Sequence, residues 1–202
     1  LSYSTTAYLG LVFIAISLQV PVLALLLLFA HAGSKALLSM RVGGVIASTN
    51  CQDITELGGL GARMPATTGS YLVGSAGLVG LLPLGGFLCL AQAVELVGAR
   101  SAIFVPVFLL TNALTALNLT GVYRQVFLGP SLTKTRRAAE VNWQMAFPMV
   151  SLAVIVVLTQ LLLIRLESLD GLLAFPLWAA AVDVGSGLIG LLVGGFIPLN
   201  KA

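Results

Sequence analysis

The sequence predicts an all-α membrane protein, a polytopic bundle of transmembrane helices. Of its 202 residues, 58% are hydrophobic and only 8% are charged, whereas about a quarter of the residues in a soluble domain carry a charge. The mean hydropathy is +1.06, and the apolar residues form long runs that do not alternate with polar ones. Because strands of a membrane barrel alternate over about ten residues, helices are the predicted spanning elements.

The apolar runs predict a series of spans within one transmembrane domain that occupies residues 1–202. They cover residues 4–19, 21–47, 65–97, 101–127, 143–164 and 176–197. Pro21 is well placed in the first turn of a helix. The segment from Arg165 to Asp170 is interpreted as an interfacial turn between the last two spans. Since the chain starts at Leu1 inside a helical pattern, we expect it to be a fragment of a larger subunit.

The run at residues 65–97 is too long for one straight membrane helix. It would measure roughly 50 Å at about 1.5 Å per residue, against a hydrocarbon core of about 30 Å. We therefore expect a broken helix at about residues 82–86, with Pro83, Gly85 and Gly86 at the break. Irregular backbone at membrane depth is tolerated where it is buried in protein or lines a cavity. A simple proline kink is the alternative.

The second run contains two ionisable residues, His31 and Lys35, which lie four residues apart and so share a helix face with Ser34 beside them. Lys35 lies about 21 Å along a helix that starts at Pro21. Ionisable residues inside a membrane mark functional sites, and both of these can carry a proton. We interpret them as a proton relay. The alternative is that Lys35 extends its ammonium group to the membrane surface.

Further polar residues lie in the fourth span and at the end of the broken one. Thr111, Thr115 and Asn118 fall on one helical stripe, which is predicted to line a proton path together with Ser34 and Glu95. Such polar residues also commonly hydrogen-bond to a neighbouring helix, which is the simpler reading of the stripe.

Other charged and reactive residues have ordinary interpretations. Asp183 is expected to pair with Arg165 near the non-cytoplasmic surface. Cys51 and Cys89 have no metal-binding spacing, and the sequence shows no catalytic triad, phosphate-binding loop or metal-ligand cluster. We expect no cofactor or metal on this chain, and no nucleic-acid partner.

The basic residues predict the orientation. If the spans alternate, one side receives Arg41, Arg63, Arg124, Lys134, Arg136, Arg137 and Lys201, and the other receives Arg100 and Arg165. The positive-inside rule places the first side in the cytoplasm. Trp143 and Trp178 fall at span ends, as residues of an aromatic belt do.

Several segments, in order, resemble the antiporter-like subunit of complex I, the chain 5 or F type of NAD(P)H-quinone oxidoreductase, a family related to cation/proton antiporter subunits. Residues 4–10 are similar to the family's S-T-x-S-Q-x-G segment, and residues 31–38 to H-A-x-x-K-A-L-L. Residues 53–60 match D-I-x-x-x-G-G-L, Met64 and Pro65 match the following M-P, and residues 82–87 match the broken helix. The resemblance extends to about residue 129.

The resemblance implies a proton-translocating half-channel in a subunit without a redox centre of its own. Lys35 matches the family's central lysine, and His31 matches the histidine that precedes it. A second family histidine falls on Leu27, and a lysine of the broken helix falls on Leu90. These departures leave the exit route open, and Glu95 is the nearest candidate to replace the lysine.

The sequence of residues 58–68 also resembles the cyanobacterial variants of this chain that serve carbon dioxide uptake, and so does the lack of the family lysine. That narrower resemblance implies a ferredoxin- or NAD(P)H-plastoquinone oxidoreductase of photosynthesis in the thylakoid membrane. Its partners would be membrane lipid, the other membrane subunits of complex I and a cytoplasmic carbon dioxide-hydrating protein. The alternatives are a stand-alone cation/proton antiporter subunit and a non-conducting chain that anchors a cytoplasmic partner.

Overall fold

The computed structural model describes residues 2–81, 86–133, 135–136, 138–170 and 177–197, with the backbone alone described for residues 159–170. Within this part of the chain all regular structure is helical, which confirms the all-α class. The main helices are α1 (Ser2–Ser17), α2 (Pro21–Thr49), α3 (Pro65–Val79), α4 (Gly86–Arg100), α5 (Val105–Tyr123), α6 (Trp143–Asp170) and α7 (Leu177–Phe196). Short helical turns are η1 (Ile54–Glu56), η2 (Ala102–Phe104) and η3 (Arg124–Leu128).

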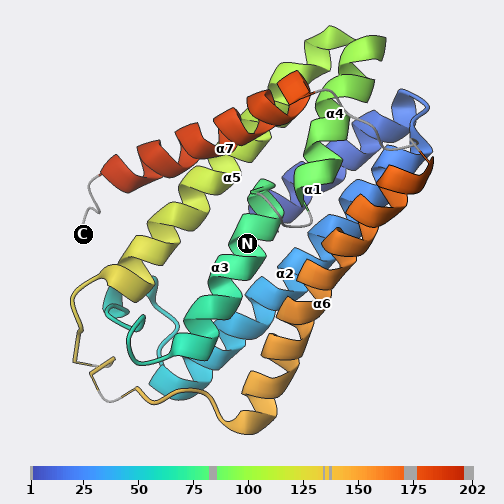
Figure 1. Ribbon diagram of the computed structural model, residues 1–202. Coiled ribbons are helices and arrows are strands. Elements are labelled where there is room, and N and C mark those ends of the chain that lie inside the picture. The colour runs from blue at the N-terminus through green and yellow to red at the C-terminus, as the bar shows by residue number, and fades with distance from the viewer. Residues whose placement is uncertain (1, 82–85, 134, 137, 171–176, 198–202) are drawn as a thin grey trace.

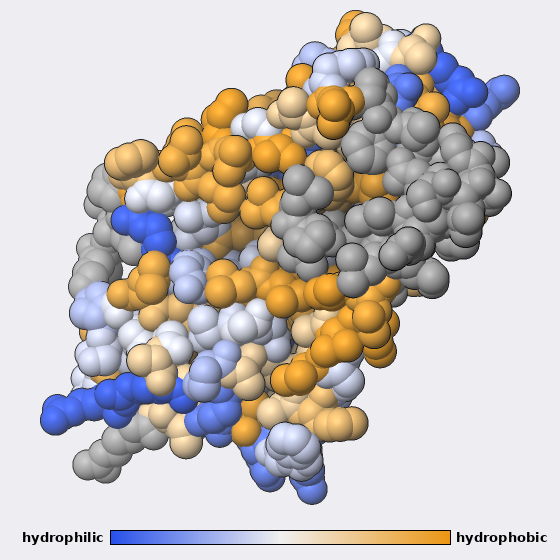
Figure 2. All heavy atoms as spheres, viewed as in Figure 1, coloured by the Kyte–Doolittle hydropathy of each residue, from blue (hydrophilic) through white to orange (hydrophobic). Residues whose placement is uncertain are grey.

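The chain is an integral membrane protein. Among the described residues, α2, the continuous helical stretch Ala102–Leu128, and α7 are long and apolar enough to cross a membrane. Apolar side chains cover much of the visible surface, and the hydrophilic ones gather towards its two ends (Figure 2). Such a distribution fits a molecule whose middle faces lipid or neighbouring membrane subunits.

α2 is the central helix of the bundle. It packs against α1, α3, α4 and α6, while α5 and α7 form a close pair alongside α3 and α4 (Figure 1). Glycines on α7 bring this pair together: a Cβ added to Gly190 would lie 2.2 Å from the carbonyl oxygen of Ala113 on α5. Arg124, which follows α5, donates hydrogen bonds to the carbonyl oxygens of Gly194 (2.9 Å) and Ile197 (2.8 Å) at the end of α7. Small residues are the usual means of close helix packing in membranes.

The long third run is divided into two helices, α3 and α4. α3 ends at Val79 and is followed by Gly80 in the left-handed region, with φ 75°. α4 begins at Gly86, where a Cβ would lie 2.3 Å from the carbonyl oxygen of Gly77. Only glycine fits so close to a backbone oxygen. The expected break residues Pro83 and Gly85 lie outside the described residues, and Gly86 is the first residue of α4.

One sequence expectation was wrong. The segment from Arg165 to Asp170 is not a turn, because α6 continues to Asp170. Arginine, leucine and glutamate are good helix formers, and no glycine or proline interrupts the sequence until Gly171. Local helix propensity therefore carries α6 past the point where its apolar run ends.

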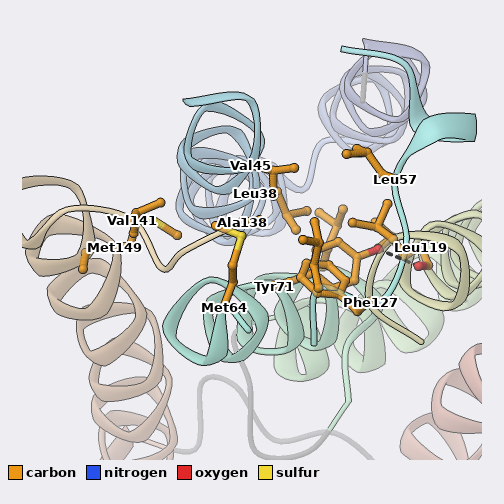
Figure 3. Close-up of a cluster of buried hydrophobic side chains, with 14 of the residues drawn as sticks. Leu38, Val45, Leu57, Met64, Tyr71, Leu119, Phe127, Ala138, Val141 and Met149 are labelled. Atoms are coloured by element: carbon orange, nitrogen blue, oxygen red, sulfur yellow. Dashed lines mark hydrogen bonds between the residues drawn. The ribbon is translucent and has the colours of Figure 1, made fainter. Parts of the chain in front are cut away.

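A cluster of buried side chains lies at one end of the bundle, which we call the loop end because it carries loops 51–64 and 129–142. Tyr71 of α3 and Phe127 of η3 lie in its centre (Figure 3). Loop 51–64 closes over it: the amide groups of Leu60 and Gly61 donate hydrogen bonds to the carbonyl oxygens of Val126 (3.2 Å) and Phe127 (3.1 Å) in η3. These bonds hold the loop against the end of α5.

Candidate functional site

His31 and Ser34 point from α2 into the bundle, with Lys35 at the margin of the same face. The buried positions of α2 recur at helical spacing, and they are Leu23, Ala24, Leu27, His31, Ser34, Leu37, Leu38, Arg41, Gly44, Val45 and Thr49. His31 is 7% exposed and Ser34 is fully buried, while Lys35 is half-buried. α2 therefore turns the polar residues of its middle towards protein rather than lipid.

Lys35 reaches across to α1. Its ammonium Nζ donates a hydrogen bond of 2.6 Å to the hydroxyl oxygen of Ser4. Tyr8 lies one helical turn after Ser4 on α1. The serine and the tyrosine thus face Lys35 and His31, which are also one turn apart on the antiparallel helix α2.

Tyr8 joins α1, α2 and α3. Its ring stacks on the imidazole of His31, with ring centroids 4.5 Å apart and an interplanar angle of 27°. Its hydroxyl donates a hydrogen bond to the carbonyl oxygen of Leu78 at the end of α3. Both ring nitrogens of His31 lack a hydrogen-bond partner among the described residues, as does the Ser34 hydroxyl. The sequence analysis missed Tyr8, although its spacing of four from Ser4 was a signal.

A second polar cluster joins α5 to α7. The Nδ2 of Asn112 donates hydrogen bonds to Oδ1 of Asp183 (3.1 Å) and to Oγ of Ser186 (3.0 Å). The Ser186 hydroxyl donates to the backbone carbonyl of Asp183 at 2.7 Å. Asn112 and Asp183 are each 1% exposed. Asp183 was expected to pair with Arg165, but its hydrogen-bond partner here is Asn112, and the side chain of Arg165 lies outside the described residues.

The two clusters approach each other at the break between α3 and α4. Oδ2 of Asp183 lies 3.1 Å, and Cδ1 of Leu90 2.9 Å, from the position that a Cβ on Gly80 would occupy. Gly80 directly follows α3, two residues after Leu78, whose carbonyl oxygen accepts the hydrogen bond from Tyr8. Leu90 of α4 and Asp183 of α7 thus approach the same point beside Gly80.

The two predicted lining threonines of α5 hydrogen-bond to their own helix. The hydroxyl groups of Thr111 and Thr115 donate to carbonyl oxygens of their own helix, those of Val107 (2.8 Å) and Thr111 (2.7 Å). Asn118 is exposed. The structure instead brings the neighbouring Asn112 into the interior.

Glu95 lies away from the break. It is half-buried on α4, and its Oε2 has no hydrogen-bond partner among the described residues. It follows Gly86 by about 14 Å of helix at 1.5 Å per residue. Glu95 is therefore separated from the break that Asp183 faces.

Arg41 is a second buried cation on α2 that the sequence analysis counted only as a basic residue of the loop side. It is 5% exposed, and its guanidinium carbon lies 4.1 Å from the ring centre of Tyr71 and 5.6 Å from that of Phe127. Guanidinium groups stack favourably on aromatic faces. Arg41 is buried because loop 51–64 folds over the end of α2. Its spacing of seven from Ser34, which puts both residues on one helix face, could have predicted this burial.

Comparison with known proteins identifies the family of the chain. Residues 1–115, more than half of the chain, match the family described as NADH:quinone oxidoreductase/Mrp antiporter, transmembrane. The chain belongs to this family. The matched region contains α1 to α4 and the first half of α5, and so includes Tyr8, His31, Lys35 and Asn112. Within the described residues no group of histidine, cysteine, aspartate or glutamate side chains is arranged to hold a metal ion.

Individual members of the family are similar over shorter or longer parts of the chain. NAD(P)H-quinone oxidoreductase subunit 5, organellar chromatophore 2, of Paulinella chromatophora is 62% identical over all 202 residues, which correspond to 33% of that protein. NADH-quinone oxidoreductase subunit L of Rickettsia bellii is 33% identical over 70% of this chain and 21% of its own length. NADH-ubiquinone oxidoreductase chain 5 of Bos indicus is 36% identical over 61% of the chain and 20% of its own length. The chain thus spans a third or less of these relatives.

Proposed function

We propose that this chain is part of a proton-translocating antiporter-like subunit of NAD(P)H-quinone oxidoreductase, in which His31 and Lys35 relay protons. The observation that carries the proposal is on α2, where the buried imidazole of His31 and the half-buried ammonium group of Lys35 lie one helical turn apart. The printed names of the relatives, all oxidoreductase subunits, support the assignment to complex I.

The chemistry of the pair suits proton transfer. Lys35 holds a proton as an ammonium group against the hydroxyl oxygen of Ser4. His31 can accept a proton at either ring nitrogen, and the stacked Tyr8 ring fixes the plane of the imidazole. Charges interact strongly in a medium of low dielectric constant, so a change of charge in a neighbouring subunit would favour loading or release of the Lys35 proton.

The electron-transfer chemistry belongs, in this proposal, to other subunits of the complex. We assign no redox centre or cofactor to this chain, which contributes a proton path alone. The exposed apolar side chains of α1, α5 and α7 are the surfaces that lipid and other membrane subunits would cover.

The test replaces Lys35 by arginine in the assembled complex. Arginine keeps the positive charge but does not release its proton at physiological pH, so we expect the number of protons moved per electron to fall by this subunit's share. Lys35→Ala should have the same effect. Ser39→Ala, an exposed position on the same helix, is the matched control.

Proton uptake by vesicles that contain the purified complex would be measured during quinone reduction, with assembly checked by native gel electrophoresis. A wild-type ratio of protons to electrons in Lys35→Arg would contradict the relay.

A stand-alone cation/proton antiporter is the second candidate, because the matched family also includes Mrp antiporters. The two assignments differ in what accompanies the chain. A complex I subunit should co-purify with iron–sulfur and quinone-binding subunits, whereas an antiporter subunit should not. A chain that only anchors a cytoplasmic partner would co-purify with the complex and show no loss of proton uptake in Lys35→Arg.

The finer assignment is a photosynthetic complex I of the cyanobacterial thylakoid membrane that acts in carbon dioxide uptake with plastoquinone. We propose it because hydrogen bonds join loops 51–64 and 129–142, with the start of α3, into one surface. Arg63 donates a hydrogen bond to the carbonyl oxygen of Thr135 (3.1 Å). Glu140 accepts one from the amide of Ala66 and one from the hydroxyl of Thr67, each at 2.7 Å. A chromatophore relative also fits a photosynthetic membrane.

A soluble carbon dioxide-hydrating protein would dock on this surface, with the exposed Arg136 at its rim and the neighbouring Arg137 outside the described residues. Rim charges mainly steer association. Arg136→Glu together with Arg137→Glu should therefore weaken binding of the soluble partner more at low salt than at high salt. A pull-down over a salt series would measure this, and equal binding at every salt concentration would remove the loops from the interface.

A further inference from the structure

The carboxyl group of Asp183 is buried in the middle of the bundle without a full set of partners. Asn112 donates to its Oδ1, but Oδ2 has no hydrogen-bond donor in the described part of the chain. A buried carboxylate is costly unless it is paired and hydrogen-bonded, and intramembrane carboxyl groups that face a bundle interior are commonly functional. The single hydrogen bond from a neutral amide leaves the charge of Asp183 uncompensated whenever it is ionised.

The unpartnered oxygen is directed at the break between α3 and α4. Gly80 has a left-handed backbone and no side chain. A Cβ built on it would lie 3.1 Å from Oδ2 of Asp183 and 2.9 Å from Cδ1 of Leu90. The carbonyl carbon of Gly86, the first residue of α4, lies 3.3 Å from the same point. Asp183 therefore faces the carboxyl end of one helix and the amino end of another.

Such a place can accommodate both forms of a carboxyl group. The last carbonyl groups of α3 carry partial negative charge and can accept a hydrogen bond from a protonated carboxyl group. The first amide groups of α4 carry partial positive charge and favour a carboxylate. Burial disfavours the ionised form, and the start of α4 offsets part of that cost, so the group can take up and release a proton.

The site is also adjacent to the relay on α2. Tyr8 stacks on His31 with one face of its ring and reaches the Leu78 carbonyl, two residues before Gly80, with its hydroxyl. The end of α3 thus contacts the Tyr8 hydroxyl at Leu78 and faces the Asp183 carboxyl group at Gly80. Side chains of α2 and α1 lead from Lys35 past His31 and Tyr8 to this end of α3.

We propose that Asp183 is a second proton-carrying residue of this bundle, which exchanges protons with the His31–Lys35 pair at the break between α3 and α4. The inference rests on the proposed proton-relay function. The step moves a proton alone: a ring nitrogen of His31 loses it as Oδ2 of Asp183 gains it, or the reverse. Tyr8 is a positioning residue, because its ring holds the imidazole and its hydroxyl occupies the carbonyl end of α3.

The test compares Asp183→Asn with Ser186→Ala in the purified complex. Asparagine has the shape of aspartate but takes up no proton, whereas Ser186→Ala removes a hydroxyl group from the same cluster and leaves the carboxyl group in place. Redox-induced infrared difference spectra would be recorded in H2O and D2O. We expect the carbonyl band of a carboxylic acid, shifted in D2O, in wild type and Ser186→Ala, and its loss in Asp183→Asn. A band that persists in Asp183→Asn would overturn the inference.

Proton uptake separates this inference from the proposed function. We expect Asp183→Asn to lower the number of protons moved per electron as far as Lys35→Arg does. A wild-type ratio in Asp183→Asn beside a lowered ratio in Lys35→Arg would overturn the role of Asp183 alone. A wild-type ratio in both variants would overturn the relay itself.

Two further measurements address assembly and ion identity. If Asp183→Asn does not assemble, Asp183→Glu keeps a carboxyl group and should retain proton uptake with an infrared band at a changed frequency. An unchanged band would show that the signal does not come from this position and would overturn the inference. Replacing sodium by potassium in the buffer should leave proton uptake unaltered, and a requirement for sodium would assign the carboxylate to a metal cation instead.

Discussion

The relay on α2 and the cluster between α5 and α7 place buried polar groups in the same bundle by different means. His31 and Lys35 lie on one helix, so their juxtaposition follows from helix geometry and a spacing of four. Asn112 and Asp183 lie 71 residues apart and meet only because two helices approach closely. The first arrangement is local and robust, whereas the second depends on tertiary packing.

Glycines on the inner face of α7 provide that close approach. Added Cβ atoms would lie 3.0 Å from a Val79 side-chain carbon at Gly187, 2.2 Å from the Ala113 carbonyl oxygen at Gly190 and 2.7 Å from the Leu117 carbonyl oxygen at Gly194. Asp183 is one turn before Gly187 on the same stripe. The comparison thus predicts that α7 packing variants alter the Asp183 cluster and leave the α2 relay in place.

The largest effect is expected for Gly190→Ala. Its methyl group would meet a backbone oxygen that cannot move without shifting α5, and overpacking of this kind costs about 1–3 kcal/mol. We expect a lower thermal stability of the complex and loss of the Asp183 infrared band. Gly185→Ala is the matched control, because a Cβ there has no atom within 4 Å among the described residues. Equal stability of the two variants would show that close α5–α7 contact is not what positions Asp183.

A smaller effect is expected for Asn112→Ala, which removes the donor to Asp183 without moving a helix. The variant loses the hydrogen bonds from Asn112 to Asp183 and to Ser186, each worth about 1 kcal/mol. The Asp183 band should shift because its hydrogen bonding has changed. Asn118→Ala replaces the same residue type at an exposed position of the same helix and should change neither. If Asn118→Ala lowered proton uptake and Asn112→Ala did not, the predicted stripe would be the path and the cluster would not.

The smallest effect is expected for Ser4→Ala on the α2 side of the comparison. This variant removes the hydroxyl that accepts the 2.6 Å hydrogen bond from Lys35. Ion-dipole contacts of partly exposed side chains contribute about 0.5 kcal/mol, as comparable exposed ion pairs do, so stability should barely change while the rate of proton uptake decreases. Ser17→Ala, at the other end of α1, is the control. An unaltered rate in Ser4→Ala would mean that this contact does not hold Lys35 in its working position.

The sequence was sufficient for features set by local physics. Long apolar runs required helices, and the length of the run at residues 65–97 required a division near Gly86. The orientation of His31 and Ser34 into the bundle followed from placing ionisable and polar residues away from lipid. Each of these inferences needs only the hydrophobic effect and the period of a helix.

Features that depend on contacts between distant segments were not predictable in the same way. Arg41 was counted as a loop-side charge because nothing in α2 shows that loop 51–64 covers it and that Tyr71 stacks on its guanidinium group. Asn118 was assigned to the polar stripe by its helical spacing, whereas Asn112 is the asparagine that is buried, because α7 packs against it. Asp183 lacked an obvious basic neighbour in sequence, and its amide partner comes from another helix.

The hydrogen bonds from Arg124 to the end of α7 have a consequence for the register of that helix. A slip of α7 by one residue would rotate Asp183 by about 100° and move it about 1.5 Å along the axis, which is enough to turn its carboxyl group away from Gly80. By holding the carbonyl oxygens of Gly194 and Ile197, the guanidinium group fixes α7 lengthwise against α5. A side chain at the loop end thereby sets the depth of a carboxyl group about 16 Å away along the helix.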